Sequence, residues 1–249
     1  MPEPLRLRWL GMLVLLACLF PAEVRADDRQ TIGHSVDGRP IALLRDGAPT
    51  PALKVLVVGD IHGDEAAGMR IARRLIAGAA PPRTVLLVVP TINPDGLAAD
   101  TRGNARGVDL NRNFPFRWRP LGGGEYSGTG PLSEPESRAA HRLILREKPD
   151  LTIWFHQPFG LIDKPEGNPF AARRFAQLIG LPLVRLHGPY PGSASRWQNH
   201  HFPNSTAFVA ELPRHVSGSL VKRGTAAVRT LAAELASPEL SGRVASPLP

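Results

Sequence analysis

The sequence is almost free of cysteine: Cys18 is the only one among 249 residues. It lies within residues 1–26, which have the features of a secretory signal: a basic start, an apolar run over Trp9–Phe20 and small residues before a cleavage point at Asp27. The stretch around Cys18 loosely resembles a lipoprotein acceptor site, but we expect complete removal. The mature chain then contains no thiol and no disulfide, so core packing must stabilise it.

The sequence also lacks an apolar run that is long enough to cross a membrane. A spanning helix needs roughly 20 apolar residues, and the run over Trp9–Phe20 is shorter than that. We therefore expect no stable membrane insertion after the signal is cleaved. The expected location is secreted, periplasmic or within the cell envelope.

Clustered basic residues are missing as well, although the formal net charge is +8. Three arginines against two glutamates in residues 1–26 leave +7 on the mature chain. No Lys/Arg run is present and no aromatic residues are interleaved with the basic ones, which disfavours nucleic acid as a partner. Two explanations of the positive charge remain: the protein binds an anionic polymer of the cell envelope, or the charge only keeps the protein soluble.

Strand-like and helix-like segments alternate along the chain, and no internal repeat is visible. We expect a hairpin over 31–44, then strands over Lys54–Val58, Thr84–Val89, Leu151–Phe155 and Thr206–Ala210, and helices over Glu65–Ala77, Ser133–Lys148, 168–179 and Val221–Leu235. This alternation predicts a three-layer α/β sandwich with a mixed, mostly parallel sheet. It forms one domain over residues 27–236, followed by a loose tail over 237–249.

Two local features refine this prediction. Ser133 and Glu136 have the spacing of a capping box at the start of a helix. Residues 93–133 show little periodicity and contain Gly122-Gly123-Gly124, and a loop of that length in a compact domain is usually functional.

Conspicuous polar residues follow four of the expected strands, in the segments GDIHGDEAAG, PTINPDG, FHQP and ELP. Ligands of open α/β sheets bind beyond the carboxyl ends of strands. His62, Glu65 and His156 make a His₂Glu set, a composition found in catalytic zinc sites. Taken singly, each has a plain structural alternative: a loop histidine, a first-turn carboxylate or a core histidine.

Other polar residues have roles that suit such a site. Asp109 could fix the tautomer of a metal-bound histidine. Asn111 and Arg112 could clamp a carboxylate, and Arg102 could stabilise a developing oxyanion. Glu211 ends an apolar strand, where a carboxylate is costly unless it is paired or functional, and it could act as a general base.

The segments HGDE, NPDG, RGNARGVDLNRNFP, SEPES, FHQP and AELP, in this order, resemble the zinc carboxypeptidase family of the carboxypeptidase A type. The resemblance spans roughly residues 31–236. Within the family, the sequence is similar to the short bacterial branch that includes murein peptide amidases. This resemblance implies a three-layer α/β fold and one zinc per chain, held by His62, Glu65 and His156. The bond cut in that branch joins D-glutamate to diaminopimelate in cell-wall peptides.

The resemblance also implies roles for further residues. Glu211 matches the catalytic base and Arg102 the oxyanion-stabilising arginine. Asn111 and Arg112 match the pair that binds the terminal carboxylate of the substrate, and Asp109 matches the carboxylate behind a metal histidine. The tyrosine that closes over the substrate is best matched by Tyr190.

The position that sets specificity in the family falls in Ala194-Ser195-Arg196, which has neither a large apolar residue nor an acid. Arg196 could receive a second carboxylate, such as that of diaminopimelate, or it could simply face solvent. We expect a peptide substrate, above all a cell-wall muropeptide. The alternatives are a general carboxypeptidase, a deacylase of N-acyl amino acids and a metal-bound wall-recognition module without turnover.

Overall fold

A computed structural model describes residues 29–240 of the chain. The expected signal segment, with Cys18, and the part of the expected tail after Leu240 lie outside these residues. Between residues 29 and 240, no helix combines the length and the apolar character that a membrane crossing requires.

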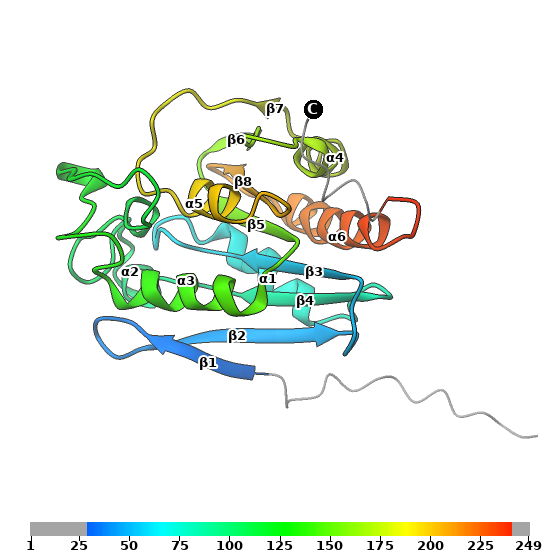
Figure 1. Cartoon of the computed structure of the whole chain (residues 1–249), viewed down its shortest axis with the longest axis horizontal. Helices are drawn as coiled ribbons and strands as arrows, with labels where there is room; N and C mark the ends of the chain where they lie inside the picture. The colour runs from blue at the N-terminus through cyan, green and yellow to red at the C-terminus, as the bar shows by residue number, and fades with distance from the viewer. Residues whose placement is uncertain (1–28, 241–249) are drawn as a thin grey trace, which may run out of the picture.

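One eight-stranded sheet runs through the structure, and helices pack on both of its faces (Figure 1). The strands are β1 (Arg29–His34), β2 (Pro40–Gly47), β3 (Leu53–Val58), β4 (Thr84–Val89), β5 (Leu151–His156), β6 (Phe159–Asp163), β7 (Leu183–Val184) and β8 (Thr206–Pro213). The helices are α1 (Ala67–Ile76), α2 (Pro94–Ala99), α3 (Pro135–Glu147), α4 (Phe170–Ile179), α5 (Ala194–His201) and α6 (Gly218–Leu235), with short 3₁₀ turns η2 (Leu110–Arg112) and η3 (Gly123–Glu125).

The strand order is β1-β2-β4-β3-β5-β8-β6-β7. The central strands β4, β3, β5 and β8 are mutually parallel, whereas β2 and β6 run antiparallel to this group on either side of it. The sheet is therefore mixed and mostly parallel, and the predicted fold class is confirmed.

Alternation along the central strands divides the core between the two faces of the sheet. Ile153 and Phe155 of β5 pack into a cluster with α1, α4 and α6. Trp154, between them, packs on the other face with residues of α3 and α5. This arrangement gives the three layers.

Most of the expected elements are present close to their predicted bounds. The hairpin forms from β1 and β2, which are antiparallel, and β4 has the predicted ends. Helix α4 ends at Gly180, whose φ of 74° is the left-handed cap that favours glycine. Strands β5 and β8 continue to His156 and Pro213, so His156 and Glu211 lie inside strands, not after them.

The predicted capping box at Ser133 and Glu136 is wrong. Helix α3 begins at Pro135, and no side chain caps it. The Ser133 hydroxyl instead donates to Glu134 at 2.8 Å, and the Glu136 carboxylate accepts from the Val36 amide at 2.9 Å. A tertiary contact with the β1–β2 hairpin therefore occupies Glu136, and Ser133 bonds to its neighbour Glu134, in place of the reciprocal bonds that the spacing suggested.

Four elements, α2, α5, β6 and β7, have no counterpart in the sequence-based prediction. Helix α5 has the sequence ASRWQNHH, in which polar residues hide the helical period, and β7 has only two residues. Strand β6 lies near the edge of the sheet, between β8 and β7, and follows β5 after two residues. Such short or polar segments carry little periodic signal.

Candidate metal centre

The register of the sheet brings His156 and Glu211 together. Strands β5 and β8 are parallel, and His156 is paired directly with Glu211. Their neighbours Phe155 and Ala210 belong to the apolar cluster with α1, α4 and α6. Because side chains alternate along a strand, His156 and Glu211 both point to the opposite face, where the cavity lies.

His62 and Glu65 come from the turn that joins β3 to α1. The Glu65 amide donates to the His62 carbonyl at 2.8 Å, which holds the two side chains on the same side of the turn. Gly63, between them, packs against the backbone of Gly96, and a Cβ at Gly63 would collide with it. The glycine of the HGDE segment is thus needed because the two loops meet backbone to backbone, whereas a Cβ at Gly96 of the NPDG segment would collide with Asn93 and with the Gly103 carbonyl.

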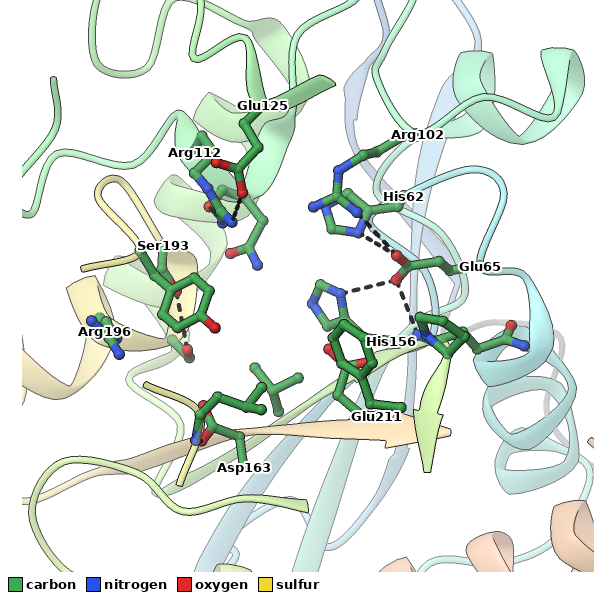
Figure 2. A pocket seen from close by; sticks show the side chains of 18 residues that line it. His62, Glu65, Arg102, Arg112, Glu125, His156, Asp163, Ser193, Arg196 and Glu211 are labelled. Carbon is green, nitrogen blue, oxygen red and sulfur yellow. Dashed lines mark hydrogen bonds and ion pairs between the residues drawn. The ribbon is translucent and has the colours of Figure 1, made fainter. Parts of the chain in front are cut away.

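The two histidines and Glu65 converge on one point (Figure 2). The Nδ1 atoms of His62 and His156 each lie 3.0 Å from an oxygen of Glu65. Potential ligand atoms from the three residues all lie within 4.8 Å of one another, and all three residues are buried.

The donor set fits a zinc ion. Two imidazole nitrogens and one carboxylate form the composition of a catalytic zinc site that keeps a position open. His62 Nδ1 is buried and lies 3.0 Å from Glu65 Oε1, and both atoms face the point where a zinc ion would bind. Burial would lower the pKa of His62, but Asp109 and Glu65 outweigh it and raise the pKa to about 9. Metal binding would therefore release a proton.

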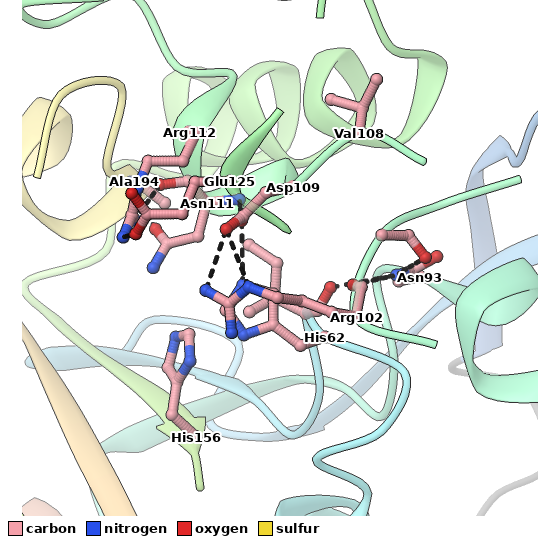
Figure 3. A network of polar contacts seen from close by, with 12 residues as sticks. His62, Asn93, Arg102, Val108, Asp109, Asn111, Arg112, Glu125, His156 and Ala194 are labelled. Atoms are coloured by element: carbon pink, nitrogen blue, oxygen red, sulfur yellow. Dashed lines mark hydrogen bonds and ion pairs between the residues drawn. The ribbon is translucent and has the colours of Figure 1, made fainter. Parts of the chain in front are cut away.

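Asp109 contacts His62 at Nε2, the ring nitrogen that does not face Glu65 (Figure 3). Its Oδ1 lies 2.9 Å from His62 Nε2, and its Oδ2 accepts from Nε and Nη2 of Arg102 at 3.0 and 2.8 Å. Burial would raise the pKa of Asp109, but His62 and Arg102 hold it well below its usual range. The carboxylate therefore stays charged and orients both partners.

Arg102 lies at the edge of the metal centre. Besides the contacts with Asp109, its Nη1 donates to Glu65 Oε1 at 3.2 Å, and its side chain is about one-third exposed. The guanidinium is thus fixed in position while it still faces the cavity.

Glu211 has the environment of an acid–base group. It is buried, and its Oε2 makes no hydrogen bond within residues 29–240. Burial raises the pKa of Glu211, with the charge of nearby Glu65 adding to the effect and His156 opposing it. A carboxylate with a raised pKa beside a metal centre is suited to taking up and returning a proton.

Asn111 and Arg112 line the opposite wall of a cavity of about 320 Å³ that contains the metal centre. Asn111 is held by its own Oδ1, which accepts from the Ala194 amide at 3.0 Å. Arg112 is almost fully buried, and its guanidinium lies 5.4 Å from the centre of the Tyr190 ring. The predicted residues Asn111, Arg112 and Tyr190 therefore share one cavity with the metal ligands.

Arg196 also lines this cavity, but much of its hydrogen-bonding capacity is used. It donates to the carbonyls of Gly188 and Pro189 at 3.0 and 2.8 Å, and its guanidinium lies 4.9 Å from the Tyr190 ring centre. Although residues 194–196 contain no acid, the fold brings Glu166 to 3.9 Å from Arg196.

Three further residues at the site were missed from the sequence. Gln157 ties the site together: its amide N–H donates to Glu65 at 3.1 Å, and its side chain bonds the start of α1 and the end of β8. Glu125 contacts Arg112, and Asp163 lies in the cavity wall below it (Figure 2). Gln157 stands in the FHQP segment and could have been found; Glu125 and Asp163 belong to no recognisable motif.

The fold and the site together define an α/β metalloenzyme with a buried His₂Glu centre. Residues 25–168 match the family model of zinc carboxypeptidases, and the chain belongs to this family. The buried His62–Glu65–His156 triad is consistent with one zinc ion per chain.

Comparison with individual proteins agrees with this family. The chain is 33% identical to murein peptide amidase A of Escherichia coli K12 over 183 residues, 66% of this chain and 74% of that protein. The crystal structure of a murein-tripeptide amidase from Escherichia coli O157 superposes with a TM-score of 0.67 at 29% identity, covering 82% of this chain and 91% of the other. Carboxypeptidase A from Helicoverpa armigera shares the fold, with a TM-score of 0.68 at 19% identity, covering 84% and 68%.

Proposed function

We propose that the protein is an exported zinc peptidase that hydrolyses the amide bond to a residue with a free carboxylate, namely diaminopimelate in a peptidoglycan peptide. The observation that carries this proposal is the content of one cavity. A His₂Glu metal centre, a buried carboxylate at Glu211 and a buried guanidinium at Arg112 all face it.

The chain's own residues would then divide the chemistry. Zinc bound at the triad would polarise the scissile carbonyl and lower the pKa of water. Glu211 takes a proton from the attacking water and returns it to the leaving amine. Arg102, fixed by Asp109, donates to the developing oxyanion.

Asn111 and Arg112 position the leaving residue by its free carboxylate, since a guanidinium offers two parallel donors to a carboxylate. Tyr190 lies against Arg112 and closes this side of the cavity. Arg112 and Glu211 lie on opposite sides of the cavity in Figure 2, so the scissile amide would lie between them.

The choice of diaminopimelate rests on charge. Its side chain ends in both a carboxylate and an ammonium group, so a matching pocket needs groups of both signs. Arg196 and Asp163 both line the cavity beyond the clamp. The similarity to murein peptide amidases and the signal-like residues 1–26 support the same substrate and an exported location.

Two other activities would use the same metal centre: a general carboxypeptidase and a deacylase of N-acyl amino acids. Arg196 is basic, and residues 194–196 include no large apolar side chain. These two features favour a charged leaving residue, and so favour the cell-wall peptidase over both alternatives. A wall-recognition module without turnover would have no use for the buried Glu211.

The test is to incubate the purified, zinc-loaded protein with muropeptides and to identify the products by mass spectrometry. We expect release of free diaminopimelate, and loss of the reaction in a chelator. If only protein substrates or N-acyl amino acids are cleaved, the proposed substrate is wrong.

A variant sharpens the test. Arg196→Ala should lower kcat/KM for diaminopimelate peptides more than for matched peptides ending in lysine, which lacks the second carboxylate. Arg173→Ala, at an exposed arginine of α4, is the control of equal charge. If the ratio of the two specificity constants is the same in wild type and Arg196→Ala, Arg196 plays no part in recognition.

A further inference from the structure

Arg112, the central residue of the carboxylate clamp, already has a carboxylate partner within the protein. Its Nη2 donates to Glu125 Oε1 at 2.5 Å. The two side chains differ sharply in exposure: 5% for Arg112 and 55% for Glu125. A buried cation is thus paired with an anion that stands largely in water.

The geometry points to Glu125 as an internal competitor for the substrate: it occupies Arg112 in the free protein, and the carboxylate of the leaving residue must displace it. This role rests on the proposed function, in which Arg112 binds that carboxylate. It makes Glu125 a specificity-determining residue, because a leaving residue without a free carboxylate has nothing with which to displace it.

The donors of Arg112 show where the two carboxylates compete. Nη1 donates to the Asn111 carbonyl at 3.0 Å, Nη2 donates to Glu125, and Nε is buried without a hydrogen-bond partner in the described part of the chain. The Tyr190 ring lies over the guanidinium, so a ligand must approach in the guanidinium plane. Because Nε is buried, a carboxylate that enters from the cavity reaches the guanidinium at its Nη atoms, and Glu125 already holds Nη2 there. Two anions at one guanidinium also repel each other, so the substrate carboxylate and Glu125 compete for Nη2.

The backbone around Glu125 permits this exchange. The preceding residues Gly122, Gly123 and Gly124 are exposed, and the space where each Cβ would stand is empty within 4 Å. The next residue, Tyr126, is anchored, because its carbonyl accepts from the Asp109 amide at 2.8 Å. Glu125 can therefore move into solvent on a glycine-rich segment while the clamp beyond it stays in place.

The first test is kinetic. Glu125→Gln should lower KM for a diaminopimelate-ended peptide by about two- to fivefold, the scale of a partly exposed ion pair, with kcat unchanged within a factor of two. Glu239→Gln, at an exposed glutamate in the turn after α6, removes the same charge away from the cavity and should leave KM unchanged.

The second test measures binding without turnover. Isothermal titration of zinc-loaded protein with free diaminopimelate and free lysine should show both binding more tightly to Glu125→Gln than to wild type. In lysinamide a neutral amide replaces the α-carboxylate, so it cannot compete with Glu125. It should bind to wild type and to Glu125→Gln with the same affinity.

The outcomes separate this inference from the proposed function. If Glu125→Gln binds both amino acids no better, or more weakly, Glu125 supports Arg112 and does not compete with the ligand. If binding tightens but no variant cleaves muropeptides, the competition stands and the proposed substrate fails.

Discussion

The two faces of the sheet differ in how many polar groups they bury. The helical side, which we define as the face covered by α1, α4 and α6, is an apolar core that includes Phe155, Phe175 and Phe208. The loop side, defined as residues 93–133 with α3 and α5, has an apolar cluster of its own and in addition buries many polar groups, among them Asn93, Asn104, Asp109 and Asn113.

The difference follows from what each side does. The apolar faces of helices need only match the sheet in shape, and their side chains can vary without altering the metal site. The loop side must hold Arg102, Asn111 and Arg112 at fixed positions on backbone that has little regular structure. Buried amide and carboxylate groups supply the hydrogen bonds that a helix would otherwise provide. Stability should therefore depend most on the helical side, and activity on the loop side and the strand ends that face it.

The largest effect is expected at Glu211, which faces the loop side. Glu211→Gln should reduce kcat by roughly two to four orders of magnitude, because the proton acceptor is lost. Zinc content and the unfolding temperature should be unchanged, since Glu211 is not one of the three metal ligands and a glutamine can still accept the hydrogen bond from the Phe159 amide. Kinetics, metal analysis and thermal melting measure the three quantities. A mutant that keeps most of its turnover number would exclude Glu211 as the base.

A substitution on the helical side should have the opposite signature. Phe175 is fully buried, and its ring lies 5.4 and 6.3 Å from those of Phe208 and Phe155. Phe175→Ala should lower the free energy of unfolding by about 3–5 kcal/mol through lost burial and a cavity. Urea denaturation measures the loss, and kcat/KM of the folded fraction should stay close to wild type. A large fall in kcat/KM would show that the two sides are coupled.

Asn113 tests the loop side itself. Its Nδ2 donates to the carbonyls of Ser127 and Gly130 at 2.8 and 3.0 Å, and its Oδ1 accepts from the Glu134 amide at 3.2 Å. Asn113→Ala should lower the free energy of unfolding by about 1–3 kcal/mol, because buried partners lose their hydrogen bonds. Because Arg112 is the adjacent residue, KM should rise as well. Urea denaturation and steady-state kinetics on the same preparation measure both, and an unchanged KM would mean that the clamp is held by other contacts.

The smallest effect is expected at an ion pair on the helical side. Arg174 donates to both oxygens of Glu234, at 2.8 and 2.6 Å, and this contact lowers the pKa of Glu234, against a smaller opposing effect of burial. Because the folded pKa lies below the ordinary value, the pair stabilises the fold above pH 4.5 and loses that effect as the pH falls through the folded pKa.

Glu234→Gln should therefore cost about 0.2–1 kcal/mol at pH 7, as a partly exposed pair does. The difference from wild type should vanish in strong acid. Urea denaturation at pH 7 and at progressively lower pH checks the trend. A difference that grows on acidification would contradict the sign of the pKa shift.

The sequence by itself determined the central strands, most of the helices and the metal-binding residues. Apolar runs such as Thr84–Val89 can be recognised as strands because burial on both faces of a parallel sheet leaves few polar positions. His62, Glu65 and His156 could be found because zinc accepts few residue types and because ligands collect at strand ends.

Only the tertiary structure decided the partners on the loop side. Glu136 bonds to Val36, 100 residues away, in place of the capping contact that its spacing suggested, and Glu125 reaches Arg112 from a glycine-rich turn. Periodicity reports what a residue does relative to its near neighbours, whereas these bonds join segments whose meeting depends on how the whole sheet is assembled. A buried polar group takes whichever partner the assembled fold places within reach, and no local pattern specifies that partner.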